Sequence, residues 1–258
     1  MADAPVERGE SEFFVGYLPR MPAGLARHVR AAAVALLLFA PVAAAAIVAF
    51  HDSLPTSAFD YGHPVELEGW LQSRPVPLLE VERPGSTGEL PSRSRYPLVA
   101  PGKFGAAGLV AGRDGERVHL EGTLAYRNGR TWVEVVEGSI RSLPGSPAAA
   151  DEPVSLGTFT LAGEIVDSKC FMGVMNPGEG KTHKACATRC ISGGIPPVLC
   201  VRGGRHASYL LLVGPNDEAV NHAVLDRIAE PVEVEGEVVR FGDLLVLRAD
   251  PARIRRLP

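Results

Sequence analysis

The sequence lacks a concentration of positive charge outside one short stretch. Its net charge is -4, and lysine and arginine gather visibly only just before a long apolar run, at Arg20, Arg27 and Arg30. A protein that binds nucleic acid needs basic side chains along the phosphate backbone. Aromatic residues make up only 6% of the chain, too few to stack bases on a barrel surface. These two absences predict that nucleic acid is not a partner.

Familiar catalytic signatures are also missing. There is no nucleophile elbow, no phosphate-binding loop and no pair of acids at a plausible spacing. There is no CxxC pair for dithiol exchange and no CxxCH site for haem. Five histidines stand singly, which indicates surface or packing roles: His51, His63, His119, His206 and His222. The sequence assigns no catalytic residue and favours a protein that is not an enzyme.

One long apolar run lies near the N-terminus. Residues 31–50 carry no charged side chain, and about 20 such residues cross the hydrocarbon core of a bilayer. Basic residues ending with Arg30 precede the run and Asp52 follows it, so the positive-inside rule places the N-terminus in the cytoplasm. We therefore predict a single-pass protein of the inner membrane, with its soluble region on the periplasmic side.

A cleavable signal peptide is the alternative for this run. The small residues 43–46 suit processing after a shorter apolar stretch that ends near Pro41. The long segment before the run, and its continuation through Ile47, Val48 and Phe50, favour an uncleaved signal anchor instead. The aromatic segment 12–18 before the anchor is interpreted as a surface or docking element, or as a disordered tail.

Two blocks with the same strand outline follow the anchor. Each opens with a strand, over residues 65–71 and 159–166, and each closes with a predicted hairpin. The hairpins pair 118–124 with 130–136, and 232–238 with 243–248. Glycines in the middle of these strands are typical of the bends in a small closed barrel: Gly69, Gly122, Gly163 and Gly236.

This outline resembles the OB-fold, twice over. The predicted fold class is mainly β, with one N-terminal transmembrane helix, two tandem small OB-like barrels and a short Cys/His helix inserted in the second barrel. The predicted boundaries are a cytoplasmic segment over 1–28, a transmembrane helix over 29–50, a first barrel over 58–143 and a second over 154–258. Linkers rich in Pro and small or polar residues over 54–57 and 143–153 bracket the blocks.

All four cysteines lie in the second block. Residues 181–194 are predicted to form a helix that Thr182 caps and the Gly193-Gly194 pair ends. His183, Cys186 and Cys190 then share one helix face, which Cys170 can approach from the preceding strand.

These residues allow three interpretations. The first is a Cys3His metal site that suits zinc or copper, with Cys170, His183, Cys186 and Cys190 as ligands. Met172 and Met175 would add soft thioether donors. Glu164 and Asp167 would accept hydrogen bonds that orient His183. In an exported chain the four cysteines (Cys170, Cys186, Cys190 and Cys200) can instead form disulfides, with Cys200 as a buried thiol if it does not pair. A reactive thiol at Cys186, beside Lys184, is the third.

The motif around these cysteines also resembles one found in other domains. The chain is similar to a broad group of uncharacterised bacterial exported domains that share Asp-Ser-x-Cys, then His-x2-Cys-x3-Cys and Gly, on an OB-like barrel. The matching positions here are Asp167, Ser168, Cys170, His183, Cys186, Cys190, Gly193 and Gly194. The group implies no activity, and Cys200 lies outside its pattern.

The sequence thus favours a membrane-anchored accessory or binding protein whose Cys/His cluster binds a metal or forms structural disulfides. A thiol-redox or metal-delivery protein is one alternative, and a small subunit of a membrane complex is another.

Overall fold

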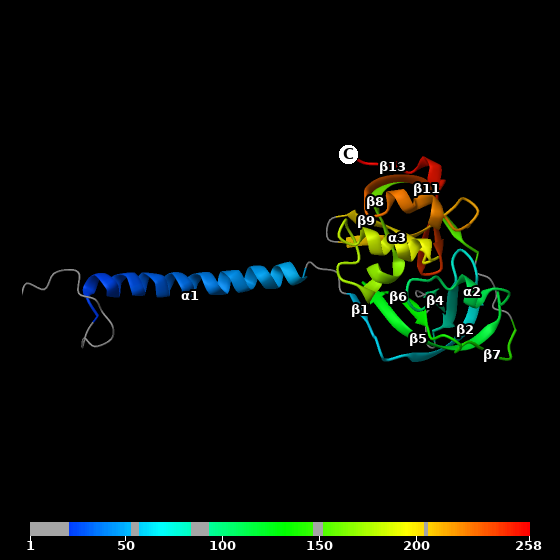
Figure 1. Cartoon of the computed structure of the whole chain (residues 1–258), viewed down its shortest axis with the longest axis horizontal. Coiled ribbons are helices and arrows are strands. Elements are labelled where there is room, and N and C mark those ends of the chain that lie inside the picture. Colours follow the sequence, from blue (N-terminus) through cyan, green and yellow to red (C-terminus); the bar gives the residue numbers. More distant parts are fainter. Residues whose placement is uncertain (1–20, 53–56, 84–92, 147–151, 204–205) are drawn as a thin grey trace, which may run out of the picture. The chain divides into compact units, whose positions relative to one another are not determined.

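The computed structural model describes residues 21–52, 57–83, 93–146, 152–203 and 206–258. It divides the chain into two compact units, Met1–Leu54 and Pro55–Pro258 (Figure 1). The aromatic segment 12–18 lies outside the described residues, as do parts of both expected linkers.

The first unit contains helix α1, Ala23–Asp52. Within Ala23–Phe50, an 18-residue window reaches a mean hydropathy of 2.6, and none of that window is buried. Pro41 lies inside the helix. By length and composition α1 is a candidate membrane span or signal anchor.

The second unit begins with a closed five-stranded barrel. Strand β2 is followed in space by β3, β4, β6 and β5, and β5 pairs with β2 to close the circle. β4 and β6 run parallel, and the other neighbours are antiparallel. The strands are β2 (Val65–Gln72), β3 (Leu78–Glu82), β4 (Arg93–Val99), β5 (Arg117–Arg127) and β6 (Arg130–Val135). Two short strands, β1 (Ser57–Phe59) and β7 (Arg141–Ser142), also pair with β5. Helix α2 (Ala107–Val110) precedes β5 in the chain.

A second barrel repeats this circuit. β8 is followed in space by β9, β10, β12 and β11, and β11 returns to β8, with β10 and β12 parallel. The elements are β8 (Val154–Asp167), β9 (Pro197–Gly203), β10 (His206–Val213), η2 (Asn221–Arg227), β11 (Pro231–Phe241), β12 (Leu244–Arg248), η3 (Pro251–Arg253) and β13 (Arg255–Arg256). This strand order confirms two OB-like barrels in tandem.

Turns and glycines explain how such short strands close. Asn128 and Gly129 join β5 to β6 with φ of 49° and 75°, the two positive values of a tight hairpin turn. At Gly69 a Cβ would lie 2.3 Å from the carbonyl oxygen of Glu80 on the neighbouring strand, and at Gly163 it would lie 2.5 Å from that of Cys200. Glycine therefore lets neighbouring strands approach more closely than any side chain would allow.

Three apolar cores hold the second unit together. One fills the first barrel and includes Leu71 and Leu120, and another fills the second barrel and includes Leu199 and Val234. The third core joins residues of both barrels, among them Val99, Trp132, Phe171, Cys190 and Leu211. Burial of apolar surface between the barrels makes them one compact body.

The segment between β8 and β9, residues 168–196, carries the candidate site and is called the cysteine segment below. It contains the π-helical turn η1, Cys170–Val174, and helix α3, Lys184–Ser192. Ala187 and Ile191, four residues apart on α3, are buried in the core of the second barrel. The prediction that Thr182 caps this helix is wrong by one residue, because His183 occupies the N-cap position. At the other end Gly193 is the C-cap, as expected.

Candidate metal and thiol site

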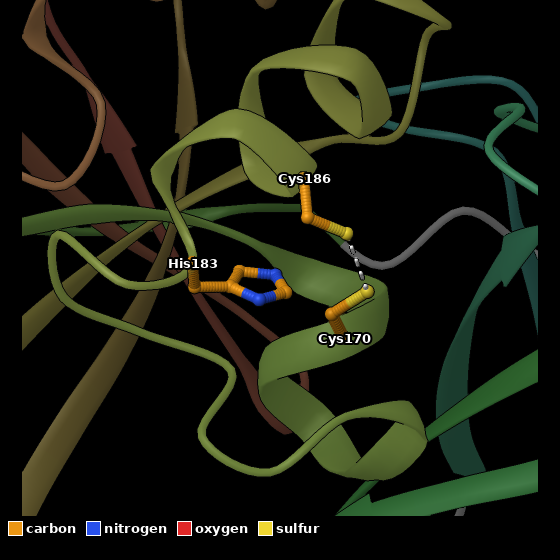
Figure 2. A group of neighbouring side chains, drawn as sticks. All are labelled: Cys170, His183 and Cys186. Carbon is orange, nitrogen blue, oxygen red and sulfur yellow. Dashed lines mark hydrogen bonds between the residues drawn. The ribbon is translucent and has the colours of Figure 1, made fainter.

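The cysteine segment folds its reactive side chains toward one point. Cys170 lies in η1, directly after β8, while His183 precedes α3 and Cys186 lies in its first turn. One ligand atom from each of these three residues lies within 4.8 Å of the other two (Figure 2). Cys170 and His183 are buried, and Cys186 is partly exposed.

The spacing of the sulfur atoms suits a tetrahedral ion. Sγ of Cys170 and Sγ of Cys186 are 4.0 Å apart, and all four cysteines are free thiols. Two thiolates on one tetrahedral zinc, each at about 2.3 Å, stand about 3.8 Å from each other. A cation therefore fits between the two thiols with little movement.

Asp167 holds the ring of His183 in one orientation. Its Oδ2 lies 2.9 Å from Nε2 of His183, and its Oδ1 accepts a hydrogen bond of 2.8 Å from the backbone N–H of Cys170. Asp167 is completely buried, so this pairing is shielded from water. With Nε2 engaged, Nδ1 is the ring nitrogen left to bind a cation, an arrangement that metal-binding histidines commonly adopt.

Cys190 joins the cluster from the next turn of α3. It forms a second close group with Asp167 and Cys170, whose ligand atoms also lie within 4.8 Å of one another. The four predicted ligands thus occupy two overlapping groups that share Cys170. Cys200 belongs to neither of these groups and lies buried on β9, where burial raises the pKa of its thiol to about 11.

A lysine from the first barrel completes the surroundings. Nζ of Lys103 lies 2.8 Å from Sγ of Cys186 and 3.8 Å from Sγ of Cys190. Lys103 could not be predicted as part of the site, because it lies 83 residues before Cys186 and no local motif marks it. The lysine expected beside Cys186, Lys184, instead pairs with Glu230 at 2.6 Å.

The thiols and this lysine shift one another's pKa values. A hydrogen bond from Cys170 lowers the pKa of Cys190 to about 7, against the opposing effect of burial, and the charge of Lys103 adds to the lowering. The same hydrogen bond, with burial, raises the pKa of Cys170. The hydrogen bond to Cys186 raises the pKa of Lys103, which keeps its positive charge. The cluster therefore favours a thiolate at Cys190, next to a fixed cation.

The loop that carries Lys103, residues 100–105, is called the cap loop below. The buried Lys169 of the cysteine segment donates to the carbonyl oxygens of Ala100 and Gly102, each at 2.8 Å, and pairs with Glu134 of the first barrel. The N–H of Gly105 donates to the carbonyl oxygen of Gly193 at 3.0 Å. The first barrel thereby forms one wall of the site.

Other predicted residues take different roles. Met172 is completely buried in the core between the barrels. Met175 is 44% exposed, and its Sδ lies 3.9 Å from Sγ of Cys186. Glu164 accepts a hydrogen bond from the N–H of Gly180 at 2.6 Å, so of the two expected acceptors Asp167 is the one bound to His183.

Comparison with known proteins adds no assignment. No protein-family model matches the chain, and no curated protein or solved structure is significantly similar to it. The site's chemistry therefore rests on its own geometry, that is, on Cys/His and Asp/Cys groups close enough to hold a metal ion.

Proposed function

We propose that this protein is a membrane-anchored, extracytoplasmic accessory protein that holds one transition-metal ion in its cysteine segment. Cys170, His183 and Cys186 are the proposed ligands, and Cys190 is the fourth. Thiolate and imidazole donors favour zinc or copper over magnesium or calcium. No group in this proposal acts as a catalytic residue.

The observation that carries the proposal is the support for His183. A buried carboxylate binds one ring nitrogen, and the ring and two thiols converge with sulfur atoms 4.0 Å apart. A histidine with only a packing role would not need two thiols opposite it. Burial of Cys170 and His183 would also reduce competition from water ligands on their side of the ion.

The resemblance to bacterial exported domains gains a physical meaning in this proposal. The Asp, His and three Cys positions of the shared pattern correspond to the residues around the ion. The two glycines, Gly193 and Gly194, correspond to the contact with the cap loop, since a Cβ on Gly193 would lie 2.0 Å from the carbonyl oxygen of Lys103. We propose that the pattern encodes a metal site closed by the preceding barrel.

The proposed location follows from α1 and its flanking charges. Basic residues such as Arg27 and Arg30 precede the apolar core of the helix, and Asp52 ends it. The positive-inside rule then supports a cytoplasmic N-terminus and a periplasmic second unit in the inner membrane. We propose other subunits of a membrane complex as the partners in such a location.

Metal content tests the proposal. The full chain, purified in detergent without chelators, is expected to contain about one zinc or copper ion, as a four-ligand site does. Cys186→Ala should lose the ion, whereas Cys200→Ala, which removes a buried thiol outside both groups, should retain it. The proposal is wrong if the wild-type chain takes up neither metal, or if both variants lose it equally.

A thiol-redox function is the second candidate, because one specific contact favours it. Cys170 and Cys186 stand close enough for a modest shift to join them, and Cys186 is partly exposed. Their oxidation to a disulfide would pass two electrons and two protons to a partner disulfide, which becomes two thiols. A native mass lower by about two hydrogens, without metal, would support this candidate over the first.

A further inference from the structure

We propose that the metal which this site takes up is the cuprous ion, and that Met175 is the residue that first captures it and passes it to Cys186. This inference rests on the proposed function and adds to it the identity of the ion and the route by which it arrives.

The route begins with a contact between two sulfur atoms of unequal exposure. Sδ of Met175 lies 3.9 Å from Sγ of Cys186, and 44% of Met175 is exposed. Cys186 is partly exposed, whereas Cys170 and Cys190 are only 4% and 1% exposed. Sulfur donors therefore lead from the surface to the buried ligands in steps short enough for one ion to be shared by two donors.

A pocket opens at the same place. It has a volume of about 300 Å³, and its lining includes Met175, Lys103, Cys170 and Cys190, with Phe59 and Tyr61 from the first barrel. An ion that enters this pocket meets Met175 together with the thiols of Cys170 and Cys190 in its lining. The position of Met175 on an open pocket distinguishes it from Met172, which is completely buried in the core.

The chemistry of the thioether selects the ion. A thioether carries no charge and is a soft donor, so it binds Cu(I) and contributes little to a zinc site. An exposed leucine would serve equally well for packing at this position. The methionine in sulfur contact with Cys186 adds a donor that suits an ion accepting both kinds of sulfur.

Transfer needs no change in oxidation state. The bond between copper and Sδ of Met175 breaks as a bond to Sγ of Cys186 forms, and the proton of that thiol leaves to solvent. Further exchange to the thiols of Cys170 and Cys190 moves the ion inward. The carrier that supplies the ion loses Cu(I), and the protein gains it.

Two methionine variants test the proposal on the metal-free full chain, in detergent and without oxygen. Cu(I) is supplied as its bicinchoninate complex, whose colour fades on transfer, and zinc binding is measured separately by competition with a chromophoric chelator. Met175→Leu should slow Cu(I) transfer or weaken its binding about tenfold and leave zinc affinity unchanged. Met172→Leu, a substitution of equal size in the core, should change neither.

The outcomes separate this inference from the function on which it rests. Selective loss of Cu(I) transfer in Met175→Leu supports the route. If Met175→Leu and wild type take up Cu(I) alike while the cysteine cluster still binds metal, the route is wrong and the metal site stands. If wild type binds neither ion, both proposals fail.

Discussion

The two barrels share one strand circuit but differ in the connection between their first and second strands. In the first barrel β2 and β3 are joined by residues 73–77, whereas in the second barrel β8 and β9 are joined by the cysteine segment, residues 168–196. The longer connection carries Cys170, His183 and the helix α3. The barrel supplies a rigid frame in both cases, and the reactive groups lie on the connection.

The first barrel still takes part in the site. Its connection between β4 and β5 contains the cap loop, which places Lys103 against Cys186 and meets Gly193 through backbone contacts. The second barrel provides the candidate ligands and the first provides a wall and a cation. This division predicts that substitutions at the contact between the barrels, and not only substitutions inside the site, will affect the site.

The largest effect is expected from Gly193→Ala, which breaks the contact between the barrels. Gly193 has ordinary backbone angles, φ -80° and ψ 3°, so alanine is conformationally allowed there. Its Cβ would however lie 2.0 Å from the carbonyl oxygen of Lys103. We expect the cap loop to be displaced, with a loss of about 3 kcal/mol in the free energy of unfolding and roughly 10 °C in Tm. Thermal unfolding followed by near-ultraviolet circular dichroism measures this.

Gly108→Ala is the matched control for this substitution. Gly108 lies in α2, and a Cβ there would meet no atom within 4 Å. Alanine favours a helix over glycine by about 1 kcal/mol, so the control should be neutral or slightly more stable. Equal Tm values for Gly193→Ala and wild type would show that the cap loop does not dock on the cysteine segment.

The second-largest effect is expected from a substitution that changes the tautomer of His183 and leaves the barrels intact. Asp167→Asn keeps an oxygen for the N–H of Cys170 but presents an N–H to Nε2 of His183. The ring must then accept at Nε2 and hold its proton on Nδ1, so Nδ1 cannot bind an ion. We expect metal affinity to fall about 10- to 100-fold.

Chelator competition for zinc measures this fall, and Glu164→Gln is its control. Glu164 accepts from the N–H of Gly180, and glutamine offers the same acceptor. The control should bind zinc as wild type does. If Asp167→Asn binds zinc with unchanged affinity, then His183 is not a ligand in the tautomer that Asp167 imposes.

The same comparison shows which parts of the fold the sequence could predict. The hairpins of both barrels follow from alternating residues such as Val232 and Val234, because one buried face is a local property of a strand. Strands β3 and β4 were not predicted, because they bury Glu80 and Arg95, whose ion pair of 2.9 Å joins the two strands. A buried charge with a partner on another strand interrupts the apolar pattern of both segments.

The candidate site was predictable where its parts lie close together in the sequence. Helical spacing brought His183, Cys186 and Cys190 together, and proximity to a strand end added Cys170 and Asp167. Lys103 could not be found, because its approach depends on how the two barrels pack and not on its neighbours in the sequence. Lys184, adjacent in sequence, was the wrong lysine, since its side chain turns to Glu230.

The smallest effect is expected from substitutions of the two lysines, Lys103 and Lys184. Lys103→Gln removes the ammonium that lies 2.8 Å from Sγ of Cys186, and Lys184→Gln removes the one that pairs with Glu230. A cation beside thiolates lowers the electrostatic cost of keeping them deprotonated for a metal, but Lys103 is partly exposed and water screens its charge. We therefore expect a loss of about fivefold in zinc affinity for Lys103→Gln and none for Lys184→Gln. Zinc competition at low salt measures both variants side by side. Equal losses would mean that net charge alone matters, and the first barrel would then contribute a wall to the site but no specific cation.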